Sequence, residues 1–208
     1  METTTDPRIH LAAALSTAGT VVRAVRPDQL GDATPCPDFD VRTLLGHLVE
    51  VVHSVAAIGR GDDPFAGGPD LSSVPDDGWS GAFEPAAHEA QAAWTDDAAL
   101  VRTVTLPWAE GPGGTILLGY AGEITVHTWD VAVATGQQPD WDHETMVAVL
   151  AISQKALPAE GRLESFAAIQ ERLPEQWRGG PPPYGEAVAV DDDSPLIDQI
   201  VAWHGRRP

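Results

Sequence analysis

The chain has 208 residues, with 31 acidic and 12 basic side chains and a formal net charge of −19 at pH 7. This length fits one domain with a packed core, and so negative a surface repels phosphates and anionic lipid, so we expect neither nucleic acid nor a membrane as a partner. A single cysteine excludes an intramolecular disulfide, and the polar first residues lack the basic and apolar regions of a secretory signal, so we expect a cytoplasmic protein.

Two helices are predicted in the first part of the chain. Asp6 is a capping residue, and it precedes a helical apolar pattern over residues 7–27 that opens on a proline, the residue best tolerated in a first helical turn. After a loop, Asp38 or Asp40 caps a second helix with a wide apolar stripe, which ends at Gly59 and Gly61. Both helices therefore present one face to a core.

The rest of the chain continues the helical pattern with longer connections. In order it predicts a loop at 60–82, a helix at about 83–100, a strand at 101–106, a helix at about 115–135 closed by Gly136, a helix at 142–157, a weaker one at 163–173 and a short one at 195–203. The strand can pair with the region of Ile116 across a glycine-rich turn at 111–114, as a small hairpin. We therefore predict an all-α fold, a four-helix bundle with extra short helices, a small β-hairpin and a loop-rich C-terminal tail. It forms a single domain over 1–208, with the bundle core at about 6–157 and a C-terminal extension at about 158–208.

The helix at 115–135 carries the residues with the clearest chemistry. Glu123 and His127 are four residues apart, so both stand on one face of the helix, on or beside the side that packs inward. A buried carboxylate needs a cation or a proton, and this helix contains no lysine or arginine. A divalent metal would supply the charge, because carboxylate and imidazole are common ligands of zinc, nickel and iron.

His47 is the candidate for a third ligand, because it lies on the apolar stripe of the second helix. The alternative for His47 is a hydrogen-bonded core histidine. Asp130 follows His127 by three residues and can orient a ligand imidazole by accepting a hydrogen bond from its ring N–H. The alternative for Asp130 is a helix residue bonded to a neighbouring loop. Cys36, between two prolines, is expected to have a structural role in its loop. The residues leave catalytic groups unassigned.

Two stretches of the sequence resemble a known family. They are residues 34–48, TPCPDFDVRTLLGHL, and residues 123–136, EITVHTWDVAVATG. Together they resemble the mycothiol-dependent maleylpyruvate isomerase N-terminal superfamily, which belongs with the DinB-like metal-binding four-helix bundles. The closing stretch, residues 184–208, is similar to the actinobacterial metal-binding branch of that superfamily.

The resemblance implies that His47, Glu123 and His127 form a metal triad, with zinc first and nickel or iron as alternatives. It implies mycothiol or a similar small thiol as a cofactor, and a small electrophile as the substrate of transfer or isomerisation. Residues 138–208 are too few and too loop-rich for the second, α/β domain of the isomerase itself. The resemblance therefore implies the metal-binding bundle for this chain, and not the isomerase's second domain. Two other functions are possible: metal-assisted hydrolysis at the same site, and a non-catalytic bundle that binds a metal or ligand. A homodimer is a further possibility.

Overall fold

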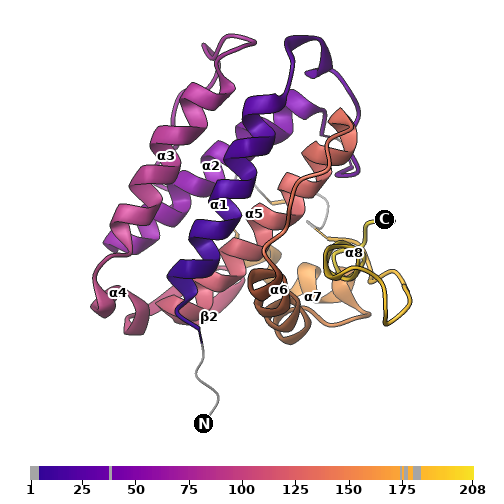
Figure 1. Ribbon diagram of the computed structural model, residues 1–208. Coiled ribbons are helices and arrows are strands. Elements are labelled where there is room, and N and C mark those ends of the chain that lie inside the picture. Colours follow the sequence, from indigo (N-terminus) through magenta and orange to yellow (C-terminus); the bar gives the residue numbers. More distant parts are fainter. Residues whose placement is uncertain (1–4, 38, 174, 176–177, 180–183) are drawn as a thin grey trace.

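Four long helices form the main body of the protein (Figure 1). The computed structural model describes residues 5–37, 39–173, 175, 178–179 and 184–208. Within these residues the elements are α1 (Pro7–Ala24), α2 (Val41–Arg60), α3 (Trp79–Ala93), α4 (Asp97–Val101), β1 (Thr103–Leu106), β2 (Ala109–Pro112), α5 (Gly113–Thr135), α6 (His143–Ala156), α7 (Arg162–Ile169) and α8 (Leu196–Trp203), with short 3₁₀ turns at Pro27–Gln29 and Gln170–Arg172. The predicted mostly helical fold with one small hairpin is confirmed.

The bundle closes on itself because each long helix packs against two others. Helix α1 contacts α3 and α5, and α2 contacts the same two helices from the other side. The core between them is filled by leucine, valine, isoleucine and alanine side chains, joined by Phe83 and Trp94. Helix α2 is long and apolar enough to cross a membrane by length and composition alone; in this fold its apolar stripe belongs to the bundle core.

The helix ends follow the capping chemistry predicted from the sequence. The side chain of Asp6 accepts a hydrogen bond from the backbone N–H of Arg8 at 2.9 Å, and Asp40 accepts from Thr43 at 2.8 Å. Asp40 is therefore the cap of α2, while the alternative cap, residue 38, lies outside the described residues. Gly136 adopts a left-handed conformation with φ of 70° and ends α5, as predicted.

The structure corrects two predicted elements. Helix α3 starts at Trp79, inside the predicted loop, and ends at Ala93 because Asp96 caps a separate short helix, α4. The hairpin pairs β1 with β2, so the partner strand ends before Ile116, which lies in α5. The glycines after β2 begin a helix instead of a turn, and the backbone of Gly113 lies so close to the carbonyl of Ala99 that a Cβ would not fit there.

The C-terminal part of the chain packs beside α5. Helix α6 contacts α1, α5 and α8, and α8 also contacts α5 (Figure 1). The segment after residue 183 joins this group through backbone hydrogen bonds, with the N–H of Val188 donating to the carbonyl of Ala202 at 2.9 Å and that of Ala187 to Ala159 at 3.1 Å. This packing brings residues 184–206, which we call the C-terminal strap, next to the polar residues of α5.

Candidate metal centre

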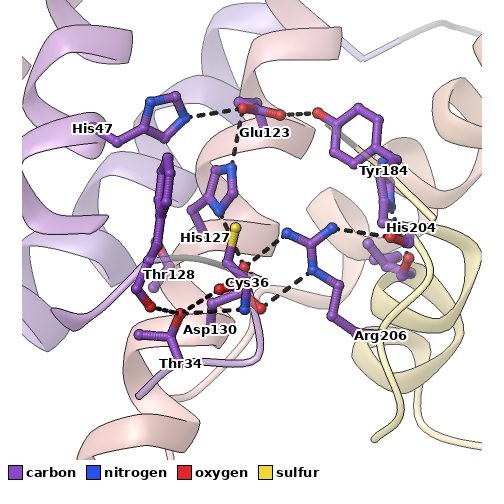
Figure 2. A network of polar contacts seen from close by, with 12 residues as sticks. Thr34, Cys36, His47, Glu123, His127, Thr128, Asp130, Tyr184, His204 and Arg206 are labelled. Carbon is purple, nitrogen blue, oxygen red and sulfur yellow. Dashed lines mark hydrogen bonds and ion pairs between the residues drawn. The ribbon is translucent and has the colours of Figure 1, made fainter. Parts of the chain in front are cut away.

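Three predicted site residues converge between α2 and α5. His47 lies on α2, Glu123 and His127 lie on α5, and their donor atoms all fall within 4.8 Å of one another. The Nε2 atoms of His47 and His127 both donate to the same carboxylate oxygen, Oε1 of Glu123, at 3.3 and 3.1 Å (Figure 2). The helical spacing and the two apolar stripes thus bring two imidazoles and one carboxylate to a single point.

The site is mostly shielded from solvent. The side chain of His127 is 6% exposed, that of Glu123 17% and that of His47 30%, so the opening lies on the His47 side. Burial raises the pKa of Glu123, but the charge of His127 and the hydrogen bonds from both imidazoles outweigh it and hold this pKa well below its ordinary value. Burial lowers the pKa of His127, but the negative charge of Glu123 and the hydrogen bond to Asp130 hold it well above its ordinary value. Without a metal, the pair is therefore a carboxylate and an imidazolium.

Asp130 lies on the opposite side of the His127 ring. Its Oδ2 accepts a hydrogen bond from Nδ1 of His127 at 3.0 Å, and its side chain has no exposed surface. An acceptor on Nδ1 keeps the proton on that nitrogen, so Nε2 is the nitrogen that can give up its proton and offer a lone pair to a metal. The position of Asp130 is thus the one expected for a residue that orients a ligand imidazole.

Arg206 completes this side of the site and was missed from the sequence. Its Nη2 and Nε donate to the two carboxylate oxygens of Asp130 at 2.9 and 3.3 Å, and its Nη1 donates to the carbonyl of His204 at 2.9 Å. A buried carboxylate in a helix without basic residues requires a cation from elsewhere, which was the available signal. That signal does not say which of the arginines supplies the charge.

Tyr184 is the second residue that sequence reasoning missed. Its hydroxyl donates to Oε2 of Glu123, the oxygen that neither imidazole contacts (Figure 2). The Tyr184 ring packs edge-on against the ring of His204, with centroids 4.8 Å apart, and the guanidinium of Arg206 lies 5.8 Å from its centroid. The proline- and glycine-rich sequence before this tyrosine gave no signal that it meets α5.

Cys36 also lies closer to the site than its predicted loop role suggests. Its loop is tied into a tight turn in which the hydroxyl of Thr34 donates to the carbonyls of Cys36 and Phe39 at 3.1 and 2.7 Å. The turn buries the thiol and places the Phe39 ring 5.7 Å from the ring of His47. The loop before α2 thereby covers one flank of the site.

A second group of donors is formed by Cys36, His127 and Asp130, whose atoms also lie within 4.8 Å of one another. Metal binding there is disfavoured because the guanidinium of Arg206 already neutralises Asp130 and would repel a cation. The first group contains no guanidinium: among the described residues, the hydrogen bonds to its carboxylate come from two imidazoles and a phenol, and an imidazole can lose its proton when a metal binds. Two imidazoles and one carboxylate are a donor set that suits zinc and other divalent transition metals.

The fold and site therefore define a four-helix bundle with a three-donor candidate metal centre between two of its helices. The chain belongs to the mycothiol maleylpyruvate isomerase N-terminal domain family, whose profile matches residues 11–132. Two uncharacterized proteins of Mycobacterium tuberculosis, from strains CDC 1551 and H37Rv, are each 28% identical to it over 201 residues, which cover 97% of this chain and 98% of theirs. No solved structure matches the chain with statistical significance. The matched family region contains all three candidate ligands and ends before the C-terminal strap.

Proposed function

We propose that the chain binds one divalent metal ion through His47, Glu123 and His127, and that this site activates a small thiol. The thiol is mycothiol or a chemically similar molecule, and the reaction is its transfer to, or its use in isomerising, a small electrophile. The observation that carries the proposal is the convergence of both imidazole Nε2 atoms on one oxygen of Glu123, inside the bundle. Membership of the mycothiol maleylpyruvate isomerase family supports the choice of thiol.

Zinc is the first choice of metal, with nickel and iron as alternatives, because all three accept imidazole and carboxylate ligands. Three protein ligands leave a further coordination position, which distinguishes a catalytic from a closed structural site. When bound, the cation would lower the pKa of a thiol at that position, so that the thiolate forms near neutral pH. The more exposed side of the site, at His47, is where a small molecule would enter.

The protein's own groups prepare the donors. Asp130 holds the proton of His127 on Nδ1 and leaves Nε2 facing Glu123 and His47. Because His127 carries a proton on Nε2 in the metal-free state, that proton must leave when a metal binds. Burial of the pair keeps water from competing with these contacts.

The test is a thiol titration of the protein loaded with Co²⁺, a spectroscopic substitute for zinc. N-acetylcysteine is the probe, and N-acetylserine, which differs only by oxygen in place of sulfur, is the matched control. We expect N-acetylcysteine to produce a sulfur-to-cobalt charge-transfer absorption and to release about one proton per site, and N-acetylserine to do neither. A cobalt spectrum that does not change when the thiol is added would contradict thiol activation and favour a metal site that serves stability alone.

A further inference from the structure

The C-terminal strap, residues 184–206, lies outside the matched family region and contacts one candidate ligand, Glu123, and the residue that holds another, Asp130 beside His127. We propose that the strap is part of the metal centre and positions its ligands: Tyr184 positions Glu123, and Arg206 positions His127 through Asp130. The proposal rests on the proposed function, because it concerns how the ligands of that same metal site are held. Both are positioning residues, since each acts through another side chain.

The first step concerns the carboxylate of Glu123, whose two oxygens have different partners. Oε1 accepts from both imidazoles, whereas Oε2 accepts from the hydroxyl of Tyr184. The hydrogen bond from the phenol draws Oε2 toward Tyr184, so Oε1 is the oxygen that faces both imidazoles and is placed to bind a metal beside them. Tyr184 therefore favours single-oxygen ligation and leaves more of the coordination sphere to a small molecule.

The second step concerns the orientation of His127. Arg206 clamps both oxygens of Asp130, and Asp130 in turn accepts the Nδ1 proton of His127. The side chains of Arg206 and Asp130 are 3% and 0% exposed, so water does not replace either contact. The guanidinium supplies the positive charge that a buried carboxylate requires, and its two hydrogen bonds fix the direction in which Asp130 meets the imidazole N–H.

The third step is that the strap holds both residues as one unit. Gly205 has a left-handed φ of 84° and packs closely on Gly185. A Cβ on Gly205 would lie 2.8 Å from the Cα of Gly185. The first residue of α7, Arg162, adds a hydrogen bond from Nη1 to the carbonyl of Gly185. The residue after His204 and the residue after Tyr184 are thus in backbone contact, so the strap presents the phenol and the guanidinium in a fixed relation.

The experiment measures Co²⁺ affinity, by competition with a chromophoric chelator, and the visible Co²⁺ spectrum of the full chain. The test variants are Tyr184→Phe and Arg206→Met, and the matched control is Arg207→Met. Arg207 is the exposed neighbour of Arg206. Tyr184→Phe deletes one hydroxyl and leaves the ring packed on His204, so it keeps the test valid if Arg206→Met folds poorly.

We expect each test variant to bind Co²⁺ about 10- to 100-fold more weakly and to change the Co²⁺ spectrum, with the Arg207→Met control unchanged. Because Arg206 packs against the Tyr184 ring and the two ligands share a hydrogen bond, the loss in the double variant should differ from the product of the single losses. Wild-type affinity and an unchanged spectrum in Tyr184→Phe would overturn the proposal while leaving the metal site intact. Failure of the wild-type chain to bind Co²⁺ would instead overturn the proposed function on which it rests.

Discussion

Replacing Arg206 by methionine should destabilise the protein strongly, because it removes one partner of a fully buried ion pair. The guanidinium donates two hydrogen bonds to Asp130 and one to the carbonyl of His204, and Asp130 has no exposed surface. Removing one partner of such a pair typically costs 3–5 kcal/mol, and since His127 still donates to Asp130, we expect a loss of about 3 kcal/mol.

The loss is measured by urea unfolding of the metal-free protein, with Arg207→Met as the exposed control. In thermal unfolding, about 3 kcal/mol corresponds to a fall in Tm of roughly 6–12 °C for a chain of this length. Adding Asp130→Asn to Arg206→Met should recover part of the loss, because the double variant buries no unpaired charge. A loss below about 1 kcal/mol, typical of a solvated surface pair, would refute the reasoning.

Two further predictions test the packing of the strap. Gly205→Ala should lower Tm more than Gly136→Ala. An alanine at either position is strained by the positive φ, at about 1–3 kcal/mol, but only at Gly205 does it also meet another backbone. Equal losses would argue against that close approach. Burial lowers the pKa of His204 from 6.5 to about 4. As the pH falls from 6.5 toward 4, the unfolded chain therefore binds a proton at this histidine that the folded chain does not, and the free energy of unfolding decreases over that range. Above pH 6.5 the histidine is neutral in both states and this loss is absent. His204→Asn should remove about 3 kcal/mol of this pH dependence and His88→Asn, at an exposed site, none; an unchanged slope in His204→Asn would count against a buried neutral imidazole.

The helices and the three candidate ligands were predictable because they obey local rules. Apolar spacing sets the bundle, and a four-residue interval places Glu123 and His127 on one face of α5. His47 was found in the same way, from its place on the apolar stripe of a second helix. Each of these inferences used only residues within one helix and the general tendency of apolar faces to pack together.

The strap contacts were not predictable, because they join residues far apart in the chain. Tyr184 is 61 residues from Glu123, and Arg206 is 76 residues from Asp130. Neither partner lies in a periodic pattern, since the tail is rich in glycine and proline and its fold depends on packing against α5. The strand partner of β1 was misplaced for a related reason, because no pattern in the sequence indicated the close packing of Gly113 against Ala99.

The central claim is that His47, Glu123 and His127 hold one metal ion, and direct titration with Zn²⁺ tests it. Binding is followed by calorimetry on the metal-free chain and checked by elemental analysis after dialysis. We expect one Zn²⁺ per chain, loss of most of the affinity in His127→Ala because two remaining ligands cannot hold the ion, and no change in His88→Ala, which alters an exposed histidine. Absence of Zn²⁺ binding, or equal affinity in His127→Ala and the wild-type chain, would contradict the account.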